Sequence, residues 1–375
     1  MKSDRFRAAF PRAMELTYLD TAAEGLPVAT EADALLQYFR DKSLGTPGRK
    51  EFHRVEGEAL TLAAELLGTD AENVTFLGSA SEAMSVLANS IEWRTGDEVI
   101  ISDLEFPSNV LSWLRLRDQG VKVVVVGNVG GALRWEDVES RLNERTRLIS
   151  LSLVSYKTGA YLPFVPQLAE AARRVDAVLA IDATQALGRC PLSLAGVDYL
   201  YSSSFKWMMG PHGLGLVYVS PEYRAKMADP SSIGWYSVPN VFTPDRYERY
   251  ELKAGARSLA GGMPNFPALY GIRQSLRFLL DVGVDSIWRE MGPLVEEMRA
   301  GLAGLGCQML TPEGEQYASG IVAFSHERAE AIGAALAERD VIVWAGDGRV
   351  RASLHLYNNA ADVARYLEVL REILA

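Results

Sequence analysis

The sequence predicts an α/β protein with a mostly parallel sheet in a large domain, joined to a smaller α+β domain. Short apolar runs, typical of buried strands, alternate with stretches of helical periodicity over roughly the first 220 residues. This alternation indicates right-handed crossover connections between parallel strands. With 375 residues, the chain is long enough for two cores. We expect the large domain at residues 12–258 and the small domain at residues 1–11 and 259–375.

The large domain begins with two helical patterns, at residues 31–43 and 52–67, which the turn Gly45-Thr-Pro-Gly48 separates. Strands follow where branched and apolar residues are bounded by turn residues. The run Val121–Val126 is so rich in valine that we expect a strand buried on both faces. In chain order, strands are expected at 73–77, 98–102, 121–126, 148–155, 178–182, 199–203 and 214–219, and helices at 79–90, 135–143 and 166–175.

The segment from residue 229 to residue 265 shows little periodicity and is rich in Pro, Gly, Tyr and Trp. A structureless stretch of this length is uncommon in a compact domain unless it has a function. After it, two long helical patterns run to about Leu305. The rest of the small domain is expected to hold strands at 320–325, 341–344 and 349–354, with helices at 327–339 and from 361 onward.

Composition favours an ordinary cytoplasmic protein. Hydrophobic residues make up 48% of the chain, and the net charge of −10 argues against a nucleic-acid-binding surface. No apolar run reaches membrane-spanning length, and the N-terminus lacks the apolar core of a signal peptide, so no membrane partner is expected. Cys190 and Cys307 form no disulfide framework, and the four histidines show no metal spacing, so no metal site is expected.

A single lysine, Lys206, lies between aromatic residues in a stretch of buried-strand and turn character. The strand from Tyr199 ends in three serines, and turn residues from Gly210 lead to the next strand. A lysine held out of water has a lowered pKa, and its neutral amine is a nucleophile suited to a Schiff base. The alternative is a lysine that extends past Phe205 and Trp207 and keeps its charge in water.

A second stretch favours the nucleophile. The apolar strand Val178–Asp182 ends in a carboxylate that should face the crevice where open α/β sheets bind ligands. Pyridoxal phosphate (PLP) needs a lysine for its aldehyde and an acid for its pyridine nitrogen, and Asp182 can be that acid. Gln185 can donate a hydrogen bond to the phenolic oxygen of the ring. Asp182 could instead cap a helix, but its combination with Gln185 and Lys206 makes a PLP site the better interpretation.

These residues resemble the class V aminotransferase and cysteine desulfurase group of fold type I PLP-dependent enzymes. The resemblance extends from Tyr18-Leu-Asp-Thr-Ala-Ala to the C-terminal helix. It implies a large domain with a seven-stranded sheet, PLP on Lys206, a small amino acid as substrate, and a homodimer whose 229–265 segment reaches the partner subunit's active site. The motifs that carry the resemblance are Asp182-Ala-Thr-Gln185, Ser203-Ser-Phe-Lys206 with Gly210-Pro, and Arg351-Ala-Ser with Tyr357-Asn358.

The resemblance also implies a phosphate-binding turn at Gly78-Ser-Ala-Ser81. A strand enters a helix here, where free N–H groups and the helix dipole favour an anion. Ser79, Ala80 and Ser81 match the family's turn, although Ala80 stands where the desulfurases usually have a threonine. Ser79 and Glu82 also have the spacing of a capping box, and the two roles are compatible.

Three other positions concern the cofactor. Phe106 matches the ring that stacks on the pyridine face in relatives, although phenylalanine cannot carry protons as the desulfurase histidine can. Ser203, in the lysine motif, is assigned to the cofactor as well. In Gly261-Gly-Met263-Pro-Asn265, Met263 stands where the family has a threonine that contacts the neighbouring subunit's phosphate.

Arg351 matches the family arginine that binds the substrate α-carboxylate through two parallel hydrogen bonds, a role that suits arginine best. Arg349 lies two residues earlier on the same strand, and we expect one of the two to face solvent, with Arg349 as the surface charge. Tyr156 stands where the desulfurases usually have asparagine, and it is expected to reach the cofactor or the substrate.

The reaction is predicted by excluding the persulfide chemistry of the desulfurases. A persulfide-forming desulfurase needs a thiolate on a mobile loop just before the Arg-x-Ser strand, and the matching segment 341–351 has no cysteine. Cys190 and Cys307 are expected to be buried small hydrophobes. We therefore predict aminotransferase-type chemistry. The alternatives are a cysteine desulfurase, a selenocysteine or C–S lyase, an amino-acid epimerase and a catalytically silent PLP-fold protein, the last disfavoured by the joint presence of Lys206, Asp182 and Arg351.

Overall fold

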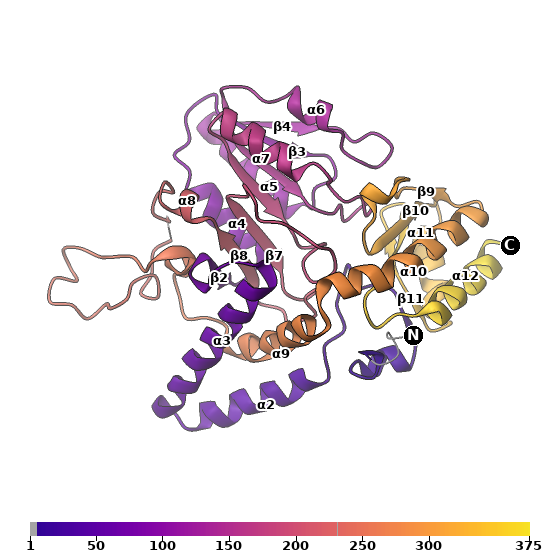
Figure 1. Ribbon diagram of the computed structural model, residues 1–375, viewed down its shortest axis with the longest axis horizontal. Coiled ribbons are helices and arrows are strands. Elements are labelled where there is room, and N and C mark those ends of the chain that lie inside the picture. The colour runs from indigo at the N-terminus through magenta and orange to yellow at the C-terminus, as the bar shows by residue number, and fades with distance from the viewer. Residues whose placement is uncertain (1–5, 231) are drawn as a thin grey trace.

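A seven-stranded sheet forms the centre of the computed structural model, which describes residues 6–230 and 232–375 (Figure 1). The strand order is β2-β8-β7-β6-β5-β3-β4, and among these strands β8 alone runs antiparallel to its neighbours. The predicted α/β class with a mostly parallel seven-stranded sheet is confirmed. The strands are β2 (Val74–Leu77), β3 (Glu98–Ser102), β4 (Lys122–Val126), β5 (Thr146–Ser152), β6 (Val178–Asp182), β7 (Tyr199–Ser203) and β8 (Gly215–Val219).

Helices cover both faces of this sheet, and alternate strand residues pack against each layer. On β6, Leu179 and Ile181 belong to the core on one face, whereas Ala180 belongs to the core on the other. Helix α7 (Val165–Arg174) packs on the first face, and α4 (Ala80–Asn89) with α5 (Ser108–Leu114) packs on the second. Burial on both faces explains why these strands read as continuous apolar runs.

The strand β4 lies at the edge of the sheet and pairs with β3. Its Val125 is 48% exposed, so the expectation of a strand buried on both faces was wrong. The valine-rich composition reflects a high β-propensity, which an edge strand can satisfy as well as a central one.

The remaining helices form two groups. Helices α2 (Thr30–Ser43), α3 (Arg49–Leu67) and α9 (Phe266–Val282) pack against one another at the bottom of Figure 1. Helices α10 (Val284–Gly304), α11 (Ala329–Ala337) and α12 (Ala360–Leu374) belong to the orange and yellow part of the chain at the right. Two short helices, α6 (Trp135–Glu139) and α8 (Pro221–Arg224), lie in connections of the large domain.

The small domain contains an antiparallel sheet of order β12-β13-β10-β9. Near it, β1 from the N-terminal arm pairs in parallel with β11. This pairing brings Asp20 beside Ser353 of β13. The division of the chain at residue 258 stays a prediction. The strands are β1 (Thr17–Tyr18), β9 (Gln308–Met309), β10 (Ile321–Ser325), β11 (Val341–Ile342), β12 (Trp344–Gly346) and β13 (Arg349–Ser353).

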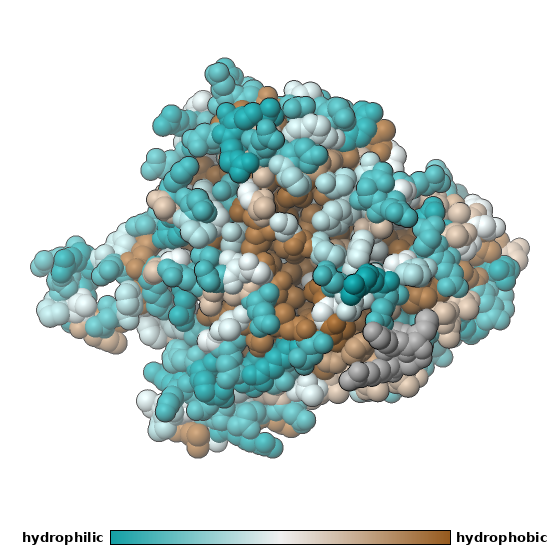
Figure 2. Space-filling model, viewed as in Figure 1, coloured by the Kyte–Doolittle hydropathy of each residue, from teal (hydrophilic) through white to brown (hydrophobic). Residues whose placement is uncertain are grey.

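The segment between α8 and α9 projects at the left of Figure 1 and contains one 3-10 helix, Gly255–Leu259, in its described part. Several of its large side chains are exposed, namely Trp235, Phe242, Tyr247 and Tyr250. In the space-filling view, hydrophilic residues cover most of the periphery, and hydrophobic residues gather near the middle of this face (Figure 2). Within the described residues, no helix is long and apolar enough to cross a membrane.

Candidate active site

A pocket of about 160 Å³ lies at the carboxyl ends of β5, β6 and β7, beside the N-terminus of α4. This is the edge where open α/β sheets bind ligands. The structure therefore brings together residues that lie up to 127 positions apart, from Ser79 to Lys206. The residues that were singled out from the sequence and that line this pocket are Ser79, Ala80, Ser81, Phe106, Tyr156, Asp182, Gln185, Ser203 and Lys206.

The turn that carries Lys206 is held rigidly from both sides. Met209 N–H donates to the Lys206 carbonyl at 3.0 Å, and Met209 has φ of +56°, a left-handed conformation that is costly for a bulky side chain. Gly25 N–H donates to the Phe205 carbonyl at 2.8 Å. A Cβ at Gly25 would lie 2.0 Å from the Lys206 carbonyl oxygen, so the N-terminal arm can approach the turn only with a glycine there.

The Lys206 side chain is buried, with 9% of the residue exposed. Its Nζ lies 5.2 Å from the ring centroid of Phe106 and 5.7 Å from that of Phe205. Burial and, to a smaller extent, the nearby charge of Arg351 lower the pKa of Lys206, and Asp182 partly offsets them, so that the pKa is about 8. A lysine that extends into water is thereby excluded in favour of a desolvated amine, which is the form that acts as a nucleophile.

Asp182 ends β6 and is buried. Its Oδ1 accepts a hydrogen bond from Thr184 N–H at 2.9 Å, so the carboxylate also stabilises the local turn. Burial raises the pKa of Asp182, while Thr184 and Lys206 lower it. The described residues include no ion-pair partner for this carboxylate. A buried anion needs a cation nearby, and a protonated pyridine nitrogen supplies one, so Asp182 fits PLP.

The amide of Gln185 has a fixed orientation. Its Oε1 accepts from Trp207 Nε1–H at 2.6 Å, and its Nε2 donates to the Ala22 carbonyl at 3.0 Å. Because an indole N–H can only donate, Oε1 and Nε2 cannot be exchanged here. A primary amide has two N–H hydrogens, so the second remains for the phenolic oxygen of the cofactor, as predicted for Gln185.

The start of α4 combines a helix cap with hydroxyl groups that line the pocket, as predicted for the phosphate turn. Ser79 Oγ accepts from Glu82 N–H at 3.0 Å and Glu82 Oε2 accepts from Gly78 N–H at 2.7 Å, which is a capping arrangement. Ser81 Oγ donates to Ser108 Oγ at 2.8 Å, so two hydroxyl groups face each other at the pocket. Ser108 was not assigned from the sequence. Its place at the start of α5, two residues after Phe106, was the available signal.

Arg351 is buried, with 3% exposed, and unlike the other predicted site residues it does not line this pocket. Its Nη1 donates to the Tyr156 carbonyl at 2.9 Å, and its Nη2 lies 3.7 Å from Asp20 Oδ1. Burial lowers the pKa of Arg351 to about 10 and raises the pKa of Asp20 to about 6, while the pairing of the two charges opposes both shifts. Arg351 Nε has no hydrogen-bond partner among the described residues, so donor capacity is left for a carboxylate.

Arg349 is also buried, with 6% exposed, and the expectation of a surface charge was wrong. Residues two apart on a strand point to the same face, so Arg349 and Arg351 belong together, and assigning them to opposite faces contradicted strand geometry. Both guanidinium groups lie over the ring of Trp344, at 4.5 Å for Arg349 and 5.2 Å for Arg351.

Neither cysteine is placed for nucleophilic chemistry. Cys190 is buried, as expected, and burial raises the pKa of its thiol to about 11. Cys307 follows α10 and is only half-buried, so the expectation of a buried residue was wrong for it, although partial burial still raises the pKa of its thiol. Both thiols stay protonated near neutral pH, which disfavours either one as an attacking thiolate.

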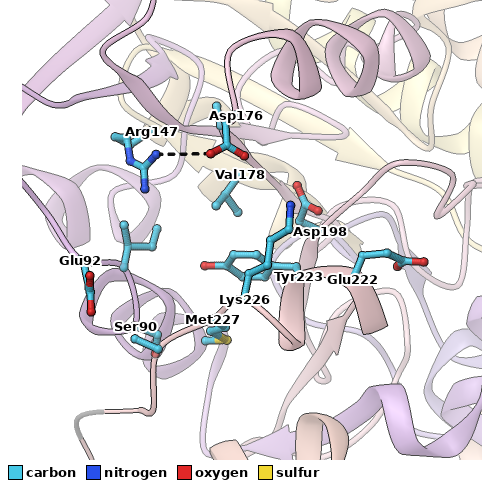
Figure 3. Close-up of a pocket in the computed structure, with 13 residues that line it drawn as sticks. Ser90, Glu92, Arg147, Asp176, Val178, Asp198, Glu222, Tyr223, Lys226 and Met227 are labelled. Carbon is cyan, nitrogen blue, oxygen red and sulfur yellow. Dashed lines mark ion pairs between the residues drawn. The ribbon is translucent and has the colours of Figure 1, made fainter.

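A second cavity, of about 310 Å³, lies at the amino ends of the same strands (Figure 3). It is larger than the pocket beside Lys206, but its charged side chains are more exposed. Arg147 and Asp176 form an ion pair of 4.0 Å there, drawn as a dashed line. Exposed charges keep their hydration, so the Arg147–Asp176 pair lacks the desolvation of Lys206 and Asp182 in the first pocket.

The fold and the lysine–aspartate pocket define a PLP-dependent enzyme. The chain belongs to the Aminotransferase class-V family, which matches residues 17–366. It is 26% identical over 402 aligned positions, covering 100% of this chain and 98% of the relative, to a "Probable cysteine desulfurase" of Methanothermobacter thermautotrophicus. It is 25% identical over 369 positions, covering 97% and 96%, to the "Uncharacterized aminotransferase YcbU" of Bacillus subtilis.

Solved structures share the fold. The apo structure of a cysteine desulfurase from Thermococcus onnurineus NA1 matches with a TM-score of 0.90 and 23% identity, covering 99% of this chain and 98% of that chain. The match to the family model over residues 17–366 confirms the family resemblance read from the motifs around Asp182, Lys206 and Arg351.

Proposed function

We propose that this protein is an aminotransferase-type enzyme that acts on a small amino acid, with Lys206 as its catalytic residue. The observation that supports this most is the buried amine of Lys206, which lies 5.2 Å from the Phe106 ring centroid and 5.7 Å from that of Phe205, within the electrostatic influence of Asp182 and Arg351. Perturbed groups of opposite kinds in one pocket are typical of active sites.

Each residue has a role that follows from its position. PLP, when bound, supplies the electron sink that makes the Cα–H bond of an amino acid acidic. Asp182 and Gln185 would hold the ring, Ser79, Ala80 and Ser81 with Ser203 would hold the phosphate end, and Phe106 would cover one face of the ring. These residues line one pocket, so a single bound cofactor can contact all of them.

The substrate is oriented by the chain's own charges. Arg351 binds the α-carboxylate through the donors that its contacts with Tyr156 and Asp20 leave free. That contact would place Cα near Lys206, whose Nζ in its deprotonated form can accept the Cα proton and return it. Tyr156 lines the pocket beside Phe106, with ring centroids 5.1 Å apart, so the two rings together form one side of the pocket.

A second candidate is cleavage of a carbon–sulfur bond. Several relatives are named cysteine desulfurases, and one solved neighbour is a complex of the cystine C–S lyase C-DES with its reaction product, cysteine persulfide. Elimination at Cβ uses Lys206 and Arg351 in the same places. A persulfide on the protein is disfavoured because the thiols of Cys190 and Cys307 have raised pKa values and lie outside the lining of the pocket.

We also propose a homodimer. The exposed aromatic side chains of the 229–265 segment support it, because large apolar side chains that cluster at a surface mark interaction sites. Light scattering of the PLP-loaded protein should give twice the mass of one chain. A fully active monomer would contradict the dimer.

The test of the function is a screen of amino acids against the PLP-loaded protein. The visible spectrum should change with the true substrate, and product analysis should then separate a keto acid from an elimination product. Borohydride reduction and peptide mapping should place the pyridoxyl group on Lys206. Label on another lysine, or persulfide on Cys190 or Cys307 with alanine as product, would overturn the proposal.

A further inference from the structure

A second buried arginine, Arg349, does not line the pocket itself but contacts Tyr156, which does. Arg349 lies on the same face of β13 as Arg351, and its guanidinium carbon lies 5.4 Å from the ring centroid of Tyr156. The Tyr156 ring contacts Phe106, whose ring centroid lies 5.2 Å from Lys206 Nζ. A series of contacts therefore leads from Lys206 through Phe106 and Tyr156 to Arg349.

The hydrogen-bonding capacity of Arg349 is only partly used. Its Nη1 donates to Asp347 Oδ2 at 2.7 Å, whereas its Nε is buried with no hydrogen-bond partner in the described part of the chain. A guanidinium has five N–H donors, and burying them unsatisfied costs free energy. The donor that an incoming anion can take over is Nη1, because its present acceptor, Asp347, is exposed.

The carboxylate that now pairs with Arg349 lies at the surface. The Asp347 side chain is 72% exposed and lies in the turn between β12 and β13. An ion pair with one exposed partner contributes a modest free energy, equivalent to no more than several-fold in affinity, because water also solvates the carboxylate when the pair is broken. A ligand acid can therefore displace Asp347 from Arg349 at a small cost in free energy, while Arg349 stays buried.

We propose that the substrate is an amino acid with an acidic side chain, whose α-carboxylate is bound by Arg351 and whose distal acid is bound by Arg349. This inference rests on the proposed function and specifies its substrate class. A planar guanidinium pairs with a carboxylate or another oxyanion through two parallel hydrogen bonds, so each arginine can take one acidic group. The alternative is that Arg349 only packs against the ring of Trp344, with its charge balanced by Asp347.

The experiment compares each acid with its amide. PLP-loaded protein is titrated with L-aspartate against L-asparagine and with L-glutamate against L-glutamine, followed by visible absorbance and by binding heat. A charge-assisted hydrogen bond to the distal acid should make the favoured acid bind about 10- to 100-fold more tightly than its amide. In Arg349→Gln this acid-to-amide ratio should fall close to one.

A second variant, Asp347→Asn, tests the site even if Arg349→Gln does not fold, and a third serves as a control. Asp347→Asn removes the competing carboxylate, and asparagine tolerates the φ of +53° at this position, so affinity for the acid should rise several-fold. Arg147→Gln, at the opposite end of the sheet, is the matched control and should keep the wild-type ratio.

The outcomes separate the two proposals. A ratio that is unchanged in Arg349→Gln, or acid affinity that is unchanged in Asp347→Asn, would overturn the distal-acid site. Amides that bind as tightly as their acids would also overturn it, while leaving the proposed function intact. A spectrum that responds to no amino acid at all would overturn the proposed function, and the distal-acid site with it.

Discussion

The two ends of the central sheet both carry a cavity with charged side chains, but they differ in how those charges meet water. At the amino end, Asp176 is 87% exposed in its side chain and pairs loosely with Arg147 (Figure 3). At the carboxyl end, Lys206 and Asp182 are buried and have shifted pKa values. Burial therefore locates the chemistry better than cavity volume does, since the amino-end cavity is the larger one.

The amino end is not uniformly solvated. Burial raises the pKa of Asp198, but that carboxylate accepts from Leu179 N–H at 2.9 Å and so helps to hold the start of β6 against β7. Tyr223 is buried beside it and its pKa is raised. Neither group adjoins a desolvated cation, so the amino end lacks the pairing of an acid with a nucleophile that marks the carboxyl end.

Replacing one lysine at each end of the sheet should give the largest difference between the two cavities. Lys206→Ala should lower turnover by about 10³-fold or more, because it removes the group that moves the Cα proton. Lys226→Ala, in the amino-end cavity, should keep turnover within about twofold. Both are measured by steady-state kinetics with the amino acid that the screen identifies. Equal losses in the two variants would refute the assignment of the active site.

Replacing one aspartate at each end of the sheet should give the next largest difference in kcat. Asp182→Asn should retain PLP but lose about 10²- to 10³-fold in kcat, because the neutral amide no longer stabilises a protonated ring nitrogen. The matched change Asp176→Asn, at an exposed position with φ of +54° that asparagine tolerates, should leave kcat nearly unchanged. Wild-type kcat in Asp182→Asn would show that another acid serves the ring.

The arginines test substrate binding at the carboxyl end. Arg351→Lys keeps the charge but loses the paired donors, so KM for the amino acid should rise about tenfold with a smaller change in kcat. Arg147→Lys should change neither constant. If Arg351→Lys binds the amino acid as well as the wild type does, a different cation holds the α-carboxylate.

The smallest expected effect concerns stability without PLP. The pKa of Lys206 is lowered to about 8 in the folded chain, so between pH 8 and its unfolded value near 10.5 the unfolded chain binds more protons and stability rises with pH. From pH 7 to pH 9, the free energy of unfolding should gain about 1 kcal/mol relative to Lys206→Met.

Urea unfolding of the PLP-free proteins at the two pH values measures this gain. Lys226→Met is the control and should keep the wild-type pH dependence, because it retains Lys206. An identical pH dependence in the wild type and Lys206→Met would show that the amine is more hydrated than its burial indicates.

Local patterns in the sequence were enough to predict all seven strands of the central sheet and to propose the candidate reacting groups, although they missed β1, α5 and β9. Buried strands that end in Asp182 and Ser203, a lysine between two aromatic residues, and small residues at a helix start are local patterns. They place side chains at the carboxyl edge once the strands are parallel, because each strand presents its last residues at that edge. This is why Lys206, Asp182 and Ser79 could be assigned before the fold was known.

Other features were decided by the tertiary structure alone. Ser108 meets Ser81 across 27 residues, and Asp20 meets Arg351 because β1 pairs with β11 beside β13. The buried place of Arg349 and the exposed place of Val125 likewise depend on which segment packs against their strand. Periodicity shows which side chains share a face, but whether that face meets water, a ring or an opposite charge is set by contacts between segments far apart in the chain.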